Sequence, residues 1–423
     1  KPKPNSRTIA CTSFPRWGSC KNCKWLQLHK EFGDEDGFFC NKCKKFGELM
    51  PARLVVTCKQ GHLDEFPWEK WAHSNPKSPV PVCSEPKLQW IGGSRSSSLS
   101  SYKVKCTTCG AENSLSDATN REDGIQALGI MTPSGDHYKI AKVFIENNIH
   151  IICDKPLTAT LEDANKLEKL VKRKKIIFAL THNYSAYPML REAKSIVDTG
   201  KVGQVLLIDI EYPQGYTVGV KKKNESSVLK WRLDKNMCGP SMILAEIGTH
   251  AYHLLRYVTS LEVREVSGEV SSLSPQISVD DNAFLTLRMK NKARASIWVS
   301  SAATGGENGL KIRVYGTKGA VEWLQDDPNN LKFTELNKPT KIITRASNQV
   351  SNFSLKSSRV AAGHPEGFFE AFANIYTEFA DSIVLKKKNK DIKFPSIDDG
   401  VKGIKFIFAA KKSSKNNGKW IKL

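Results

Sequence analysis

The chain has 423 residues, of which 40% are hydrophobic and 25% are charged, as is ordinary for a globular protein of two or three domains. No apolar run approaches the roughly 20 residues that a membrane-spanning helix needs, so we expect a soluble, cytoplasmic protein without a membrane partner. The net charge of +21 favours acidic partners such as nucleic acid or nucleotides. However, the lysines are spread over the whole chain, which makes this weak evidence.

The cysteines are concentrated at the beginning of the chain, where nine of the 11 lie between Cys11 and Cys109. Two C-x-x-C pairs come first, formed by Cys20 with Cys23 and by Cys40 with Cys43. Two residues between cysteines let both thiolates face one ion, and two such turns complete a tetrahedron. The spacing therefore predicts a structural four-cysteine zinc site, the alternative being free thiols or a redox pair.

A second metal site is predicted from later cysteines and histidines. We expect a Cys₃His zinc site formed by Cys58, His62, Cys106 and Cys109, with Cys83 or His73 as substitutes if this pairing is wrong. Both sites would be closed by four protein ligands, and their role would be to fold a segment too polar for a core of its own. The sequence thus predicts one or two structural zinc ions.

Residues 1–119 resemble a known zinc-binding fragment. The stretches Ala52–His73 ("ARLVVTCKQGHLDEFPWEKWAH") and Lys103–Ala118 ("KVKCTTCGAENSLSDA") are similar to DrmB-type proteins of the DISARM anti-phage system, which are related to helicase-associated zinc modules. The tryptophans of this basic module could stack on nucleic-acid bases, although packing around zinc explains them better. No helicase or nuclease motif accompanies the fragment.

From Asn120 onward the pattern changes to regular α/β alternation. Strands are predicted at Ile125–Met131, at the run beginning with Ile149 and at Ile176–Leu180, with helices at His137–Asn147 and after the N-cap Thr160. Alternating strands and helices joined by short loops predict a parallel sheet.

The middle strand ends abruptly at Asp154-Lys155-Pro156. In open α/β sheets ligands bind at the carboxyl ends of the strands, which is where these three residues lie. An ordinary charged loop is the alternative. We therefore take Lys155 as the candidate around which the rest of the chain is organised.

The remaining chain predicts an α+β domain. Helices near the site are expected at Pro188–Val197 and Gly248–Val258. Five strands are expected in a mixed or antiparallel sheet, at Val205–Tyr212, Val263–Val270, Ala283–Met289, Ala293–Ser300 and Leu310–Tyr315.

From Gly124 to the C-terminus the chain resembles the Gfo/Idh/MocA family of nicotinamide-dependent oxidoreductases. The matching stretches are Gly129–Ala141, Ile152–Leu157 ("ICDKPL"), Leu180–Pro188, Ile243–Leu254 ("ILAEIGTHAYHL"), Arg313–Trp323 and Ala362–Ile383. The resemblance implies a partial Rossmann domain over 120–181 and a substrate and oligomerisation domain over 182–423, whose last helix (within Phe394–Ala410) returns to the Rossmann part. It also implies self-association through the C-terminal sheet.

The same resemblance implies roles for individual residues. Lys155 would polarise the reacting oxygen, and His250 would be the general base, with Glu246 beside it because residues four apart share a helical face. The cofactor, NAD or NADP, would contact Thr132, Pro133, Asp154, Lys155 and Asn183. The substrate, a small hydroxy compound, would contact Tyr184, Trp231 and Arg232.

One part of the family pattern is missing. No Gly-x-Gly-x-x-Gly motif precedes Ile125, although this motif normally holds the cofactor pyrophosphate. Without the first half of a Rossmann fold, Ile125–Met131 would be an unpaired apolar edge unless the N-terminal module covers it. The predicted fold class is therefore multi-domain α/β and α+β, with an irregular zinc module, a truncated Rossmann-like parallel sheet, and a mixed or antiparallel sheet with helices on one face.

These observations predict an NAD(P)-dependent oxidoreductase that transfers hydride from a sugar, polyol or related hydroxy compound, with impaired cofactor binding. One alternative is a non-catalytic, zinc-dependent protein that binds nucleic acid or protein and is related to a phage-defence component. The other is a non-functional chimera produced by gene fusion, recombination or a mis-joined gene.

Overall fold

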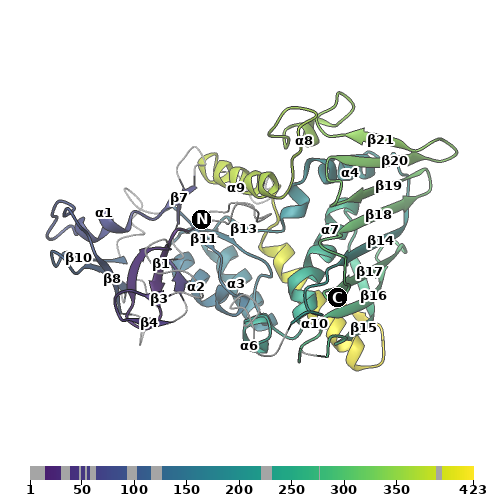
Figure 1. Cartoon of the computed structure of the whole chain (residues 1–423). Coiled ribbons are helices and arrows are strands. Elements are labelled where there is room, and N and C mark those ends of the chain that lie inside the picture. Colours follow the sequence, from purple (N-terminus) through teal and green to yellow (C-terminus); the bar gives the residue numbers. More distant parts are fainter. Residues whose placement is uncertain are drawn as a thin grey trace, which may run out of the picture. The chain divides into compact units, whose positions relative to one another are not determined.

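The computed structural model describes residues 15–29, 39–46, 49–52, 55–57, 63–92, 102–115, 126–220, 231–275, 277–386 and 393–423. The chain divides into two compact units (Figure 1). Unit 1 comprises residues 1–130 and 146–150, and unit 2 comprises residues 131–145 and 151–423.

Unit 1 is built from short strands. Its main sheet is antiparallel and has the order β10-β9-β8-β2-β1-β5. Phe66, Trp68 and Trp90 pack together beside it, with Trp68 fully buried. The elements up to residue 114 are β1 (Trp17–Cys20), β2 (Trp25–Leu28), β3 (Phe39–Cys40), β4 (Lys45–Phe46), β5 (Leu49–Pro51), β6 (Val55–Thr57), β7 (Leu63–Glu65), α1 (Trp68–His73), β8 (Leu88–Gly92), β9 (Tyr102–Cys106) and β10 (Glu112–Ser114).

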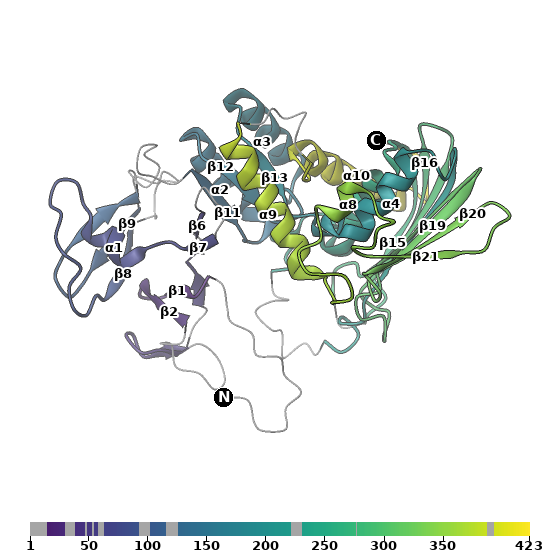
Figure 2. The same cartoon turned by 90° about the horizontal axis from the view of Figure 1, so that it is seen from above.

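The predicted apolar strand near residue 127 is β11 (Ala127–Ile130), and all four of its residues are buried. Within unit 1, the hairpin of β6 and β7 lies beside it (Figure 2). The N-terminal segment thus covers part of a strand that the sequence alone would leave as a bare apolar edge.

The β-α-β-α-β alternation is confirmed. The strands form a three-stranded sheet of order β11-β12-β13, in which β12 (His150–Cys153) runs parallel to β13 (Phe178–Leu180). The helices between them are α2 (Ser134–Glu146) and α3 (Leu161–Lys174). Thr160 caps α3 as predicted, because its hydroxyl accepts a hydrogen bond from the Asp163 N–H at 3.1 Å.

Unit 2 also contains a nine-stranded sheet of order β21-β20-β19-β18-β14-β17-β16-β15-β22. It is mixed, because β14 is parallel to β17 while the other pairs are antiparallel. The strands are β14 (Val205–Pro213), β15 (Val263–Ser271), β16 (Asn282–Met289), β17 (Arg294–Ser300), β18 (Lys311–Gly316), β19 (Gly319–Leu324), β20 (Asn330–Glu335), β21 (Lys341–Thr344) and β22 (Ile421–Lys422).

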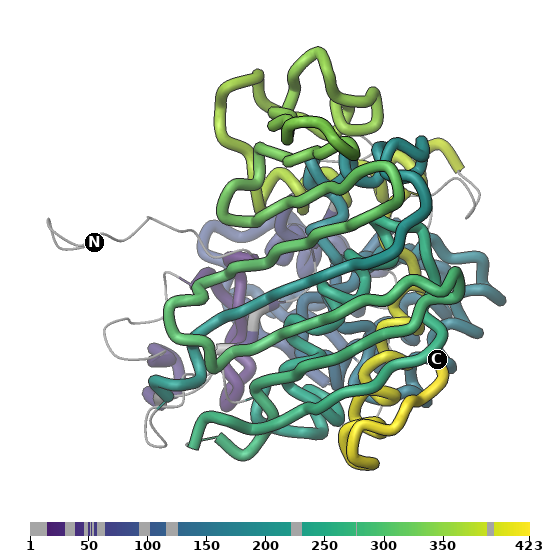
Figure 3. Tube along the Cα trace, turned by 90° about the vertical axis from the view of Figure 1, so that its right-hand side faces the viewer, coloured from purple at the N-terminus to yellow at the C-terminus, as the bar shows by residue number. Residues whose placement is uncertain are grey.

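One face of this sheet is covered by helices and the other is open (Figure 3). Side chains on β16 alternate between buried and exposed, as expected for a sheet covered on one side. The open face carries apolar side chains, among them Leu207, Phe284 and Ile342, each more than half exposed. The helices of unit 2 after α3 are η4 (Asn183–Ala186), α4 (Pro188–Asp198), α6 (Lys235–Cys238), the π-helix η5 (Leu244–Gly248), α7 (Thr249–Thr259), α8 (Asn352–Leu355), α9 (Phe368–Val384) and α10 (Ile397–Lys415).

The last helix, α10, contacts both β13 and the nine-stranded sheet. It packs against α3 and α7 and against β15 of the large sheet. Just before it, the Pro395 carbonyl accepts a hydrogen bond from the Leu180 N–H at 2.8 Å, which attaches this segment to the end of β13. None of the helices in the described ranges is both long and apolar enough to cross a membrane.

Candidate functional site

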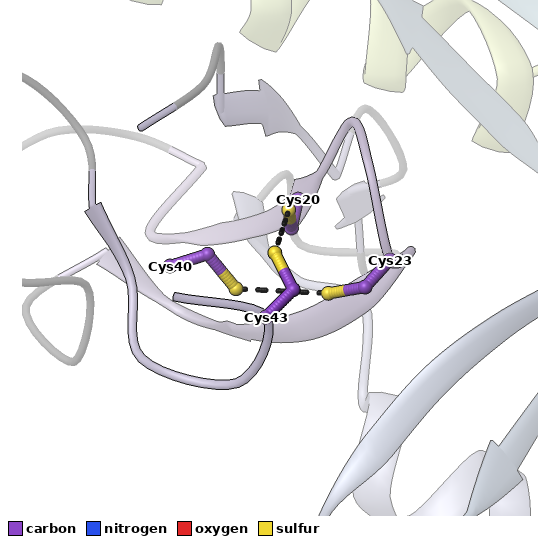
Figure 4. Close-up of side chains that lie close together, drawn as sticks. All are labelled: Cys20, Cys23, Cys40 and Cys43. Atoms are coloured by element: carbon purple, nitrogen blue, oxygen red, sulfur yellow. Dashed lines mark hydrogen bonds between the residues drawn. The ribbon is translucent and has the colours of Figure 1, made fainter. Parts of the chain in front are cut away.

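The first cysteine cluster brings together the four cysteines that the sequence grouped (Figure 4). The Sγ atoms of Cys20 and Cys43 are 3.8 Å apart, and those of Cys23 and Cys40 are 3.6 Å apart. Four thiolates bound to one zinc ion at about 2.3 Å would be roughly 3.8 Å from one another. The cluster therefore has the dimensions of a tetrahedral metal site.

Both C-x-x-C turns of this cluster have the same backbone geometry. The N–H of Lys24 donates to the Cys20 carbonyl at 2.9 Å, and the N–H of Lys44 donates to the Cys40 carbonyl at 2.8 Å. Both lysines have a positive φ, of 61° and 57°. Burial raises the pKa of the Cys20 thiol, but backbone N–H groups of Cys23 and Asn22 outweigh this and lower it to about 7.

The second cluster contains a different ligand set from the predicted Cys58, His62, Cys106 and Cys109. Cys106 and Cys109 lie together with His73 and Cys83, the two substitutes, and their ligand atoms are all within 4.8 Å of one another. Cys58 and His62 fall outside the described residues.

In unit 2, Lys155 follows the carboxyl end of β12 and its ammonium lies against Glu246. Its Nζ donates to the Glu246 carbonyl oxygen at 2.6 Å and is 3.7 Å from Glu246 Oε2. Arg232 Nη2 is 2.9 Å from Glu246 Oε1. Burial raises the pKa of Glu246, but the nearby cations Lys155 and Arg232 outweigh it and lower the pKa to about 2. The site therefore holds one carboxylate between two cations.

Glu246 and His250 lie in two consecutive helical segments, η5 and α7. Glu246 lies in the π-helical turn η5, in which the Thr249 N–H bonds to the Leu244 carbonyl five residues earlier. The carboxylate of Glu246 on this turn pairs with Lys155 and Arg232.

His250 instead contacts a second histidine. Its Nδ1 is 3.5 Å from Nδ1 of His182, whose ring stacks on His253 with centroids 4.5 Å apart. Burial, together with the charge of Lys155, holds the pKa of His250 well below its usual value. The same burial lowers the pKa of His253 to about 4. His250 is therefore neutral near pH 7, which is the form of an imidazole that can accept a proton.

Asp154 connects the ends of β12 and β13. Its Oδ1 accepts hydrogen bonds from the Lys155 N–H at 2.9 Å and from the Thr181 hydroxyl at 2.6 Å. Asp154 therefore positions the backbone of Lys155.

His137, on α2, holds two loops of the site together. Its Nε2 is 2.7 Å from the carbonyl oxygen of Thr132, and its Nδ1 is 3.0 Å from that of Pro156. The side chain is fully buried. Thr132 and Pro133, the predicted cofactor contacts, thereby lie in a loop that is tied to the loop carrying Lys155.

The remaining predicted residues surround this centre. The hydroxyl groups of Tyr184 and Tyr212 are 2.5 Å apart, and the Tyr184 ring meets His250 edge-on at 5.0 Å. Trp231 packs on an apolar cluster that includes Met242, and the Arg232 guanidinium lies 4.6 Å above the Trp231 ring. Among the described residues, the buried Nδ2 of Asn183 has no hydrogen-bond partner.

Comparison with known proteins identifies the family. Residues 190–322 match the GFO/IDH/MocA C-terminal domain. The crystal structure of an oxidoreductase from Sinorhizobium meliloti is 40% identical, covering 72% of this chain and 81% of that one, with a TM-score of 0.65. The chain belongs to the Gfo/Idh/MocA oxidoreductases.

Two further relatives of this oxidoreductase support the assignment. The uncharacterized oxidoreductase YfiI of Bacillus subtilis is 29% identical over 73% of this chain and 80% of its own length. An inositol dehydrogenase homolog from Azotobacter vinelandii, solved with NAD⁺, is 27% identical over 73% of this chain and 80% of that one, with a TM-score of 0.69. The residues that match the C-terminal domain of the family run from within α4 to within β19 and include several strands of the large mixed sheet.

The beginning of the oxidoreductase matches a different family. Residues 1–167 match a domain of unknown function (DUF8724). This match extends through Lys155 and across the predicted junction near residue 120. The resemblance of residues 1–119 to DrmB-type proteins stays a prediction.

Sequence reasoning missed three parts of the oxidoreductase site. Sequence patterns single out none of His137, Tyr212 and His182, although His182 contacts His250. A short sequence pattern hardly identifies these residues, because each contacts a partner that is 5 to 68 residues away along the chain. A histidine one turn into a helix that follows a predicted ligand loop is the one signal that could have pointed to His137.

Proposed function

We propose that this chain is an NAD(P)-dependent dehydrogenase that oxidises a secondary hydroxyl group of a sugar, polyol or related compound. The observation that carries the proposal is the ammonium of Lys155 at the carboxyl end of β12, fixed by Glu246 and lying near the neutral imidazole of His250. The Azotobacter vinelandii inositol dehydrogenase homolog has been solved with NADH and myo-inositol, which supports a polyol as the substrate class.

The residues present suit a nicotinamide cofactor. Thr132, Pro133, Asp154, Lys155 and Asn183 follow the carboxyl ends of successive strands, where the ligands of α/β sheets bind. The unpartnered Asn183 amide supplies a buried donor that a bound group can satisfy. When bound, the nicotinamide supplies the acceptor for the hydride that leaves the carbinol carbon.

The protein residues act on the proton and on the developing charge. His250, being neutral, takes the hydroxyl proton as the carbon–oxygen bond becomes a carbonyl. Lys155 donates a hydrogen bond to the same oxygen and stabilises its negative charge in the transition state. Glu246, which also pairs with Arg232, orients the lysine, and Asp154 holds its backbone.

We propose that cofactor affinity is reduced relative to other family members. The sequence contains no Gly-x-Gly-x-x-Gly motif, so it lacks the backbone donors that hold the pyrophosphate elsewhere in the family. A fluorescence titration with NADH and NADPH should give a dissociation constant above the micromolar range. Micromolar binding would contradict the reduced affinity without affecting the dehydrogenase proposal.

The dehydrogenase proposal is tested by following NAD(P)H formation at high cofactor concentration with a panel of polyols and sugars that includes myo-inositol. Changing Lys155→Met should lower turnover by about 10²–10³-fold, because a donor to the developing oxyanion is lost. Lys169→Met is a matched control, since Lys169 is an exposed residue on α3. Equal turnover of Lys155→Met and the control would overturn the proposal.

For unit 1, we propose that the four cysteines of the first cluster hold one structural zinc ion. The site is closed, with four sulfur ligands and no position for water, so its role is to fold the segment around it. Metal analysis that finds fewer than one zinc per chain would contradict this assignment.

We also propose that the open face of the nine-stranded sheet binds a second copy of the chain. It carries exposed apolar side chains on β14, β16 and β21, which a monomer would leave in water. Light scattering after gel filtration should give a multiple of the 47.2 kDa chain mass. Changing Phe284→Glu should shift the protein to the monomer.

A further inference from the structure

We infer that unit 1 holds a second structural zinc ion, bound by His73, Cys83, Cys106 and Cys109. This extends the zinc assignment of the first cluster to a site with a different ligand set. The ligands include neither Cys58 nor His62, which the spacing of the sequence favours. The site is independent of the dehydrogenase chemistry of unit 2.

The distances within the cluster fit a tetrahedral ion. The Sγ atoms of Cys83 and Cys106 are 3.7 Å apart, close to the roughly 3.8 Å expected for two thiolates on one zinc. Cys109 Sγ is 3.2 Å from Nε2 of His73, where a zinc-bound pair would be roughly 3.6 Å apart. All four ligand atoms lie within 4.8 Å of one another, so one ion can reach them all.

The histidine is oriented as a metal ligand. His73 is the last residue of α1, and its Nδ1 is 2.6 Å from the carbonyl oxygen of Glu69 one turn earlier. A carbonyl only accepts hydrogen bonds, so Nδ1 carries the proton and Nε2 keeps its lone pair. That lone pair faces the sulfur atoms. A backbone partner on the second nitrogen is the usual way in which a protein fixes the tautomer of a metal-bound imidazole.

The Cys106–Cys109 turn repeats the geometry of the first cluster. The N–H of Gly110, the residue after the second cysteine, donates to the Cys106 carbonyl at 2.9 Å, and its φ is 83°. Lys24 and Lys44 have the corresponding bond and a positive φ in the other two C-x-x-C turns. Three turns of one shape, each bringing two thiols together, indicate a common role as half of a zinc site.

The second site would join three segments of unit 1 that are separate along the chain. Its ligands come from the last residue of α1, from the end of β9 and the turn after it, and from the irregular stretch 74–87, which contains Cys83. Residues 77–85 of that stretch are largely exposed. The Thr107 N–H bonds to the Lys87 carbonyl at 2.7 Å and the Thr108 hydroxyl bonds to the Glu85 carbonyl at 2.8 Å, which align the stretch with the β9–β10 turn. A metal ion there would fix α1 and this stretch on the end of the sheet.

The test is the zinc content of the full chain, purified without chelator and measured by mass spectrometry against amino-acid analysis. We expect two zinc ions per wild-type chain, and one after Cys83→Ser or His73→Ala. His73→Cys should retain two, because a thiolate can replace the imidazole. Cys58→Ser and His62→Ala are the matched controls and should also retain two.

The outcomes separate the two sites. If the wild type binds a single zinc that is lost on Cys20→Ser, the second site is overturned and the first is supported. If that single zinc survives Cys20→Ser but is lost on Cys83→Ser, the first site is overturned and the second is supported. Loss of one zinc on Cys58→Ser, with two retained on Cys83→Ser, would overturn the ligand set.

If Cys83→Ser fails to fold, cobalt substitution of the wild type and of His73→Cys decides the question. The charge-transfer absorption from thiolate to cobalt should rise in the variant, because a thiolate replaces an imidazole. An unchanged spectrum would overturn the assignment of His73.

Discussion

The two units of this protein are stabilised by different means. In unit 1 the strands are two to five residues long, and one of its core clusters consists of Trp25 with the four cysteines themselves. In unit 2, β14 and β15 have nine residues each and α10 has 19, and a continuous apolar core lies between the sheet and its helices. Short strands bury too little apolar surface to offset chain entropy by themselves, so the proposed zinc ions would supply part of the stability of unit 1.

The strongest test of this difference is removal of zinc. A strong chelator at pH 7 should unfold unit 1 completely and leave unit 2 folded, because metal-binding energy is folding energy only where the ligands are. Scanning calorimetry should show that one of two transitions disappears. Loss of both transitions, or of neither, would contradict the separation.

Within unit 2, the next largest expected effect is the loss of turnover when His250 is replaced. Changing His250→Asn should lower turnover by about 10²–10⁴-fold, the usual contribution of a general base. His364→Asn is the control, because His364 is an exposed histidine of the same unit. If His250 is the base, the pH dependence of the residual turnover should also change. An unchanged pH profile of turnover would contradict the role of His250 as the general base.

A smaller effect is expected for the stability of the site. Changing Glu246→Gln leaves Lys155 and Arg232 without their carboxylate, which should cost about 3 kcal/mol of unfolding free energy at pH 7. The pKa of Glu246 is lowered from 4.5 to about 2 in the fold, so its ionised form stabilises the protein above pH 4.5. That contribution is lost as the pH falls from 4.5 towards 2, and the difference between variant and wild type should shrink in that interval.

Urea denaturation of unit 2 at several pH values measures this effect. The control is Glu162→Gln, whose ion pair with Lys166 is exposed and should contribute almost nothing. If both variants lose the same free energy of unfolding, the Lys155–Glu246–Arg232 network contributes no more to stability than an exposed ion pair.

The smallest expected effect is local to α3. Changing Thr160→Ala removes the hydroxyl that caps the helix and should cost about 1 kcal/mol. Thr160→Ser should keep the cap and lose less. Because Thr160 belongs to unit 2, the transition of unit 1 should not move, and a shift in unit 1 would indicate that the two units unfold together.

Local patterns predicted the parts of the site whose residues lie close together in the chain. Both C-x-x-C turns of the first cluster are made by four-residue segments, so spacing alone identified their cysteines. Lys155 was identified because an apolar strand ends immediately before it. The helix at Thr160 was predicted for the same reason, since a cap and its N–H donor are three residues apart.

Patterns could not choose between partners that are distant in the chain. Cys58 and His62 were the predicted partners of Cys106 and Cys109, with Cys83 or His73 as substitutes, and the structure places both His73 and Cys83 beside them. Helical spacing suggested only that Glu246 neighbours His250, and it gave no indication of the ion pairs that Glu246, in the π-helical turn η5, makes with Lys155 and Arg232. The sequence indicated that the N-terminal module could cover the edge at Ile125–Met131, but not that β6 is the strand beside β11.

By itself, the sequence determined the kinds of chemistry present: thiol clusters that suit zinc, a lysine at a strand end, and alternating elements that make a parallel sheet. These follow from backbone geometry over a few residues, which is the same in any fold. The tertiary structure decided which histidine faces Cys109, which cations hold Glu246, and which imidazole is kept neutral beside Lys155. These depend on contacts between residues as far as 91 positions apart, which only the folded chain brings together.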